Sequence, residues 1–382
     1  MDKDVVKPLA VVTAFRGIST SILMTFLPVY AVSIGIPLPD VGTMSAIGMG
    51  ISVLAMPFIG MAVDFLGRKA ILIISTTTLM VAPLILITYR NYVGVLTAYI
   101  LFNLALNTWV PARAVTVATS VNREVMGLSF ALVSLSFQIA RSVVPYIAGL
   151  LIRNYGYIIT FTISAITAGL ALPIILLTIP ESKSRSSSSL TIKEFIKGVI
   201  PKKNELGFQI FLCVDRGGWR LWIPILNSYM KVKLGFSEDI IGLLSTIRGI
   251  SSLISLIPSG RLVDKFGWFP ALLLSEVTGG LATLTMALAQ SSFIAAIAMA
   301  LIGLSVALWI PGFNVAVPNI IPNKSELGRT YARCNFYRSV AAVPTPWIGG
   351  MLYNIIPTLP MVAGAILILT NLGILKVFVK TR

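Results

Sequence analysis

The chain has 382 residues, of which 56% are hydrophobic and only 12% are charged, and its formal net charge is +16. Soluble domains carry about 25% charged residues, so the composition predicts an all-α membrane protein. A strongly basic chain can also bind nucleic acid, but here the Lys and Arg residues lie mostly in short segments beside apolar runs, which excludes that partner. Histidine is absent and both cysteines fall in apolar runs, so we expect no catalytic residues, metal site or cofactor.

The apolar runs divide the chain into spans separated by short loops. We predict twelve membrane-spanning helices, at residues 9–33, 41–63, 70–88, 92–120, 126–152, 157–180, 207–230, 240–263, 270–289, 292–318, 329–353 and 358–379. The longest segment outside them, 181–206, is serine-rich at its start and has an amphipathic pattern over 191–200. The sequence therefore predicts a six-helix bundle over 1–180, a cytoplasmic linker with a short membrane-surface helix over 181–206, and a second six-helix bundle over 207–382.

The two predicted bundles are copies of one unit, because matching residues recur at an offset of about 200. The pairs include Arg16 and Arg216, Gly35 and Gly235, Gly42 and Gly242, Asp64 and Asp264, Gly67 and Gly267, and the Trp-x-Pro motifs that begin at Trp109 and Trp309. One offset held over so many spans predicts two pseudo-symmetric bundles, related by an axis along the membrane normal.

The loop between the second and third predicted spans, residues 60–69, has the sequence GMAVDFLGRK. This Gly-x-x-x-Asp-x-x-Gly-Arg-Lys pattern resembles the signature loop of the major facilitator superfamily of transporters, and a weaker copy follows the eighth span. With the repeat and the helix count, the resemblance covers the whole chain. We predict gating roles for Gly60, Asp64, Gly67, Arg68 and Asp264: the glycines allow close approach and a tight turn, and Asp64 can face the positive end of a helix. A purely structural turn is the alternative for Asp64 and Arg68.

Lys and Arg are distributed unevenly between the two sides of the predicted membrane. Of the 30 such residues, 18 fall on the side of both termini and the linker, four on the other side and eight inside the spans. Because Lys and Arg concentrate on the cytoplasmic side, we predict a multi-pass protein of the cell membrane with both termini in the cytoplasm.

Every cation inside the predicted spans is an arginine, and acidic partners are few. The arginines are Arg16, Arg113, Arg141, Arg216, Arg220, Arg248, Arg333 and Arg338, and the acids are Asp215 and Glu276. A charge at membrane depth costs at least ~2.5 kcal/mol, so it must face a partner or a wet cavity. Since arginine grips carboxylate or phosphate with two parallel hydrogen bonds, the excess favours a cavity for an anion. The alternative is structural: Arg113 and Arg333 reach the interface near span ends, and others pair with Asp215 or backbone carbonyls.

Candidate substrate-binding residues are the charged and amide side chains at membrane depth that are best placed for such a cavity. They are Arg16, Arg141, Arg216, Arg220, Asn107, Gln138, Asn227 and Asn314. Arg16 and Arg216 come first because they are repeat-related, and the resemblance implies that their helices line the central cavity from opposite halves. For the amides, interhelical hydrogen bonding is an equally open role. Asp215 and Glu276 are the titratable candidates for proton coupling.

The sequence thus predicts a secondary transporter that moves a small organic solute, in our interpretation an anion, by alternating access. The alternative is a proton-coupled exporter of drug-like amphiphilic compounds. Two departures from the pattern of such exporters weigh against it: Tyr99 stands where they commonly carry arginine, and the fifth span keeps only Pro145 and Gly149 of the export-associated pattern. A receptor-like or enzymatic use of the fold is disfavoured. The expected partners are a small-molecule substrate, the lipid bilayer and a coupling proton, and we expect a monomer.

Overall fold

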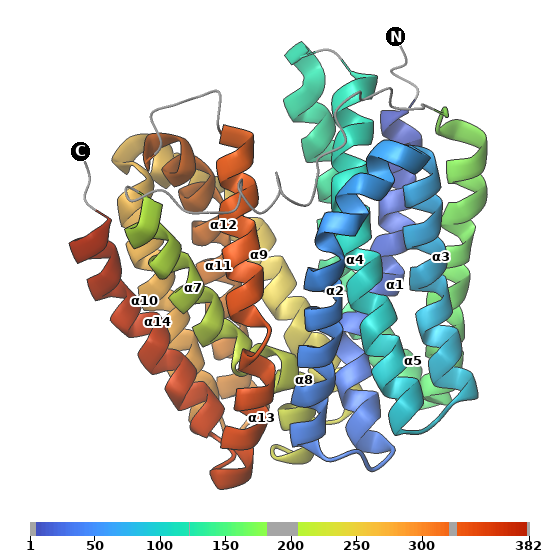
Figure 1. Ribbon diagram of the computed structural model, residues 1–382. Helices are drawn as coiled ribbons and strands as arrows, with labels where there is room; N and C mark the ends of the chain where they lie inside the picture. Colours follow the sequence, from blue (N-terminus) through green and yellow to red (C-terminus); the bar gives the residue numbers. More distant parts are fainter. Residues whose placement is uncertain (1–4, 122, 182–204, 321–326, 380–382) are drawn as a thin grey trace.

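The computed structural model describes residues 5–121, 123–181, 205–320 and 327–379, and nearly all of them are helical (Figure 1). The helices are α1 (Val6–Ser33), α2 (Leu38–Leu66), α3 (Arg68–Thr88), α4 (Tyr92–Ser120), α5 (Arg123–Thr178), α7 (Leu206–Arg220), α8 (Ile223–Val232), α9 (Glu238–Phe266), α10 (Trp268–Ala287), α11 (Ser292–Ile320), α12 (Leu327–Ala342), α13 (Thr345–Ile355) and α14 (Leu359–Phe378). Large apolar side chains such as Leu54 and Ile254 are exposed. Helices satisfy their own backbone groups, so this surface suits contact with lipid.

The twelve predicted spans are all present, although they do not coincide with twelve separate helices. α5 contains the fifth and sixth spans as two rods that meet at Gly156, where a φ of +82° interrupts the helix. Among the described residues, nine helices including α5 are long and apolar enough to cross a membrane. The pairs α7–α8 and α12–α13 form the other two spans, and each member of a pair is too short to cross alone.

The seventh and eleventh spans differ from the continuous helices that the sequence predicts, because each is interrupted. Pro224 lies at the start of α8, and Pro344 and Pro346 lie at the start of α13. Proline lacks a backbone N–H and clashes with the preceding turn, so a helix commonly ends before it. α13 packs on the break between α7 and α8: a Cβ added to Gly349 of α13 would meet the carbonyl oxygen of Leu221. Irregular backbone at membrane depth is tolerated in such protein-covered places.

The helices form two groups, α1–α5 and α7–α14, which lie side by side in Figure 1. The internal repeat is visible in the helix bounds, since both α2 and α4 recur 200 residues later as α9 and α11 with the same length. Gly67 and Gly267 have the same φ of +84° after α2 and α9. The predicted domain boundaries at 180 and 207 stay predictions, because the linker and its predicted surface helix over 191–200 lie outside the described residues.

The two groups touch at the end of the molecule away from the termini and diverge toward the end that carries both termini (Figure 1). At the touching end, α2 packs on α13 and α5 packs on α9. A Cβ at Gly42 would collide with the carbonyl oxygen of Pro346, and one at Gly242 with that of Pro145. Glycine therefore allows the backbones of the two groups to meet directly. We call this region the sealed end.

Charged side chains join the two groups at the rim of the sealed end. Arg153 of α5 pairs with Asp239 of α9 at 2.6 Å. Glu238 of α9 accepts a hydrogen bond from the Tyr157 hydroxyl at 3.0 Å and pairs with Lys231 at 2.8 Å. Breaking the sealed end therefore requires separating polar partners as well as packed helices.

The buried apolar side chains follow the same division. One cluster includes Phe26 and Trp222 and contains residues of both groups near the sealed end. Two further clusters each belong to a single group, one around Leu72 and the other around Leu272. The groups thus share a hydrophobic core at the sealed end and pack separately toward the termini.

Candidate functional site

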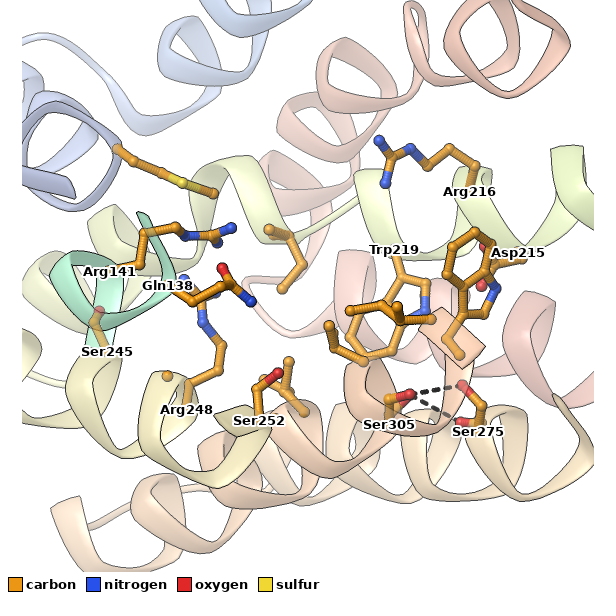
Figure 2. A pocket seen from close by; sticks show the side chains of 18 of the residues that line it. Gln138, Arg141, Asp215, Arg216, Trp219, Ser245, Arg248, Ser252, Ser275 and Ser305 are labelled. Atoms are coloured by element: carbon orange, nitrogen blue, oxygen red, sulfur yellow. Dashed lines mark hydrogen bonds between the residues drawn. The ribbon is translucent and has the colours of Figure 1, made fainter. Parts of the chain in front are cut away.

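A cavity of about 370 Å³ lies where the two helix groups meet, a size that suits a small organic molecule. Helices α7, α9, α10, α11 and α12 supply most of its wall, and α5 of the other group faces them (Figure 2). Its lining consists of Met24, Gln138, Arg141, Ser142, Asp215, Arg216, Trp219, Arg220, Ile223, Ser245, Arg248, Gly249, Ser252, Ser275, Ile302, Gly303, Ser305, Val306, Trp309, Ile310 and Arg338.

Five arginines line this cavity: Arg141 of α5, Arg216 and Arg220 of α7, Arg248 of α9 and Arg338 of α12. Figure 2 shows Arg141 and Arg248 pointing into the same space, close to Gln138. Within the described part of the chain, neither makes a hydrogen bond or an ion pair. In the same described part, Arg220 donates only to the sulfur of Met49, at 3.8 Å, and a thioether is a weak acceptor. These guanidinium groups therefore have donors available for a ligand.

Arg338 differs from the other four because a carboxylate lies in ion-pair contact with it. It forms an ion pair with Asp215 of α7 at 3.7 Å and lies 4.0 Å from the ring centroid of Trp309. Among the described residues, Asp215 is the one carboxylate in ion-pair contact with a cavity arginine. The cavity consequently carries a large excess of positive charge.

Glu276 of α10 lies behind the cavity wall, beside Asp215. It is 1% exposed, and within the described ranges neither of its carboxyl oxygens makes a hydrogen bond, nor does Oδ1 of Asp215. The two carboxyl groups interact electrostatically with each other and with Arg338, and Asn371 of α14 lies near Glu276. A proton shared between the two carboxyl groups would supply the hydrogen bond that these oxygens lack.

Arg16, the first predicted site residue, lies outside the cavity lining. It is 2% exposed and is held within the first helix group. Its Nη1 donates to Thr76 Oγ1 at 2.8 Å, its Nη2 donates to Ser75 Oγ at 3.0 Å, and its guanidinium stacks 4.0 Å from the Trp109 ring. All of these partners come from α3 and α4, so Arg16 ties three helices of one bundle together.

The corresponding place in the second group is built differently. The residue 200 positions after Thr76 is Glu276, and Arg338 rather than Arg216 stacks on Trp309. Arg216 is left at the cavity wall with an Nε that has no partner (Figure 2). One threonine-to-glutamate difference between the repeats therefore accompanies the change from a structural arginine to one that faces the cavity.

The four predicted amides are dispersed. Gln138 lines the cavity. Asn107 donates to the hydroxyl of Ser52 at 2.7 Å, and Asn227 donates to a backbone carbonyl of α1 at 2.8 Å, which joins the two groups near the sealed end. Asn314 is exposed on α11. Of the amides, only Gln138 is placed to contact a ligand in this conformation.

The predicted gating residues lie at the ends of helices rather than at the cavity. Gly67 links α2 to α3 and has the positive φ expected of a tight turn. Arg68, the first residue of α3, is buried with its Nε unpartnered, whereas Asp264 is exposed on α9. The side chain of Asp64 and the surroundings of Gly60 are outside the described part of the chain, so the gating roles of both residues stay predictions.

Several cavity residues were not selected from the sequence as site residues. For Arg248 and Arg338, the only sign of a role in the site was their position among the eight arginines inside the predicted spans. Trp219 and Trp309 were recognisable only as aromatic residues at membrane depth. The cavity serines, such as Ser252, give no signal in the sequence, because serine is common in helix contacts between membrane spans.

Comparison with known proteins agrees with this architecture. The model of the Major Facilitator Superfamily matches residues 9–222 and 209–382. The chain is 24% identical to the multidrug resistance protein MdtG of Enterobacter lignolyticus (strain SCF1) over 87% of the chain and 82% of that protein. It is 23% identical to a multi-drug resistance efflux pump PmrA homolog of Lactococcus lactis subsp. lactis (strain IL1403), over 88% of the chain and 85% of the relative. The crystal structure of the nucleoside transporter NupG superposes with a TM-score of 0.77 at 13% identity, over 99% of this chain and all of the other. The chain is a multi-pass membrane transporter and belongs to the Major Facilitator Superfamily.

Proposed function

We propose that this transporter carries small organic anions. The observation that supports the proposal is the set of five arginines around one cavity, of which only Arg338 is in ion-pair contact with a described carboxylate. Arginine binds carboxylate, sulfonate and phosphate groups in a two-pronged geometry. Trp219 adds apolar ring surface beside the charges, which suits an anion attached to an aromatic or apolar body.

A binding panel on the purified protein tests the proposal. We would follow tryptophan fluorescence and thermal stability with 1-naphthyl phosphate, 2-naphthalenesulfonate and phthalate as anions, tetraphenylphosphonium as a cation and naphthalene methanol as a neutral control. Ligands that bind the folded state raise its stability by mass action. The expected result is stabilisation by the anions and no effect of the cation. Stabilisation by the cation or the neutral compound alone would overturn the proposal.

The second candidate function is export of drug-like amphiphilic compounds. It is favoured by the similarity to proteins named as multidrug resistance transporters and by the two tryptophans in the cavity wall. The arginine excess weighs against it for cationic drugs, because an unpaired cation at membrane depth repels other cations. The panel separates the two candidates, since they differ in the sign of charge that binds.

We further propose that Asp215 and Glu276 bind the coupling proton. The pair faces Arg216 and Arg338, and protonation removes negative charge beside these arginines. Anion binding is therefore expected to strengthen as the pH falls. Glu276→Gln imitates the protonated form. Its anion affinity at alkaline pH is therefore expected to equal that of the wild type at acidic pH. Affinity measured across pH checks this, and an unchanged pH dependence in Glu276→Gln and in Asp215→Asn would assign the pair a structural role.

We also propose that the chain lies in the cell membrane as a monomer, with both termini in the cytoplasm. The excess of Lys and Arg on the terminal side supports the orientation, and the completeness of the cavity within one chain supports the monomer. Lys265 and Lys233 are exposed near opposite ends of the molecule. A cysteine probe at Lys265 is expected to react only from the cytoplasm, and one at Lys233 only from outside the cell. The reverse labelling would invert the orientation.

A further inference from the structure

The charges of the cavity do not balance when it is empty. Its five arginines face two carboxylates at most, Asp215 in the wall and Glu276 behind it, which leaves an excess of three positive charges. The sealed end closes one side of the cavity, so water reaches these charges mainly from the side of the termini. Water and small ions compensate the excess while the cavity stays open.

The unbalanced charges come from both moving halves. Arg141 belongs to α5 of the first group, and it interacts repulsively with Arg220 and Arg248 of the second group. α5 and α9 touch directly beside these side chains: a Cβ at Gly249 would lie 2.7 Å from the Cα of Ser142. The two helices therefore hold Arg141 and Arg248 opposite each other across the boundary between the halves (Figure 2).

Alternating access requires the halves to rock until the cavity is closed on both sides. Closure expels water and lowers the local dielectric constant, so repulsion between like charges grows. An anion between Arg141 and Arg248 converts this repulsion into attraction to both halves. Protons do not replace it, because protonating Asp215 or Glu276 makes the empty cavity still more positive.

We propose that this carrier changes sides only when an anion occupies the cavity, with or without the coupling proton, so that it exchanges one anion for another instead of carrying out net anion transport. The inference rests on the proposed anion function and adds the mode of transport to it. Arg141 and Arg248 are its central residues, because they place unpaired positive charge on opposite halves beside a direct contact between α5 and α9.

The experiment uses the full chain in liposomes loaded with 1-naphthyl phosphate, with dextran sulfate, a polyanion too large for the cavity, as the only other anion in the bath and the membrane potential clamped at zero. Efflux is followed by fluorescence. Adding 1-naphthyl phosphate to the bath is expected to raise tracer efflux by about tenfold or more, because the return step no longer has to occur with an empty cavity. Equal efflux with and without external anion would overturn exchange while leaving anion transport intact. Absence of both anion flux and anion binding would instead reject the proposed function.

Substitutions of the two facing arginines test whether their repulsion prevents the empty carrier from returning. Arg248→Gln and, independently, Arg141→Gln are expected to raise net efflux relative to exchange, because each removes one charge from the facing pair. Lys265→Gln is the matched control, since Lys265 is exposed on the same helix as Arg248, and its ratio of net efflux to exchange is expected to equal that of wild type. If both arginine variants fold and keep the wild-type ratio, repulsion across the boundary is not what prevents return of the empty carrier.

Discussion

Replacing Arg220 with glutamine is expected to weaken anion binding by about ten- to a hundredfold, since a charge-assisted hydrogen bond in such a site contributes ~1.5–3 kcal/mol. The same substitution is expected to raise the thermal stability of the ligand-free protein. Arg220 interacts repulsively with Arg216, Arg338 and Arg141, and its one hydrogen-bond acceptor among the described residues is the sulfur of Met49. A substitution that lowers ligand affinity and raises the stability of the ligand-free protein identifies a residue that serves binding and destabilises the fold.

Ligand titration and thermal unfolding of the same purified samples check both effects. Arg261→Gln is the control, because Arg261 is exposed on α9 outside the cavity, and neither quantity is expected to change. Arg220→Lys is expected to recover part of the affinity, since lysine keeps the charge and loses the two-pronged geometry. A loss of stability in Arg220→Gln without loss of affinity would show that Arg220 supports the fold instead of the site.

Arg16→Gln is expected to have the opposite profile, with a large loss of stability and little selective loss of affinity. The guanidinium of Arg16 donates to Thr76 and Ser75 and stacks on Trp109 in a buried place. Removing a hydrogen bond from a buried charged group costs ~1.5–3 kcal/mol, and Arg16 connects α1 with both α3 and α4.

The repeat-related Arg216 supplies the matched comparison for Arg16. Arg216→Gln is expected to lower anion affinity without lowering stability, because Arg216 lines the cavity and its Nε lacks a partner. Thermal unfolding and anion titration of the two variants, side by side, check the contrast. Equal losses of affinity in both variants, at unchanged stability, would instead support the sequence-based prediction that Arg16 and Arg216 bind the substrate together.

The helices of this protein were predictable because lipid leaves the backbone few choices. An apolar run of sufficient length must form a helix in the membrane, and the offset of 200 residues recurs in the bounds of α2 and α9 and of α4 and α11. Gly67 and Gly156 also mark helix ends that follow from local backbone geometry. The interruptions of the seventh and eleventh spans were harder to predict, because prolines such as Pro28 and Pro57 lie inside continuous helices. Whether a proline ends a helix depends on what packs against the free backbone groups.

The site was only partly predictable, and the reason lies in what a sequence repeat can show. The chain by itself determined the helical membrane fold, the two related halves, and the excess of arginine over acid inside the spans. The repeat predicted one role for Arg16 and Arg216, and only the tertiary structure separated them. Partners from other helices decide where a guanidinium points: Thr76 and Ser75 hold Arg16 within its bundle, whereas Arg338 takes the stacking place on Trp309 and leaves Arg216 at the cavity. The same dependence on neighbouring helices brought Arg141 and Arg248 together from opposite halves, because the contact between α5 and α9 exists only in the assembled fold.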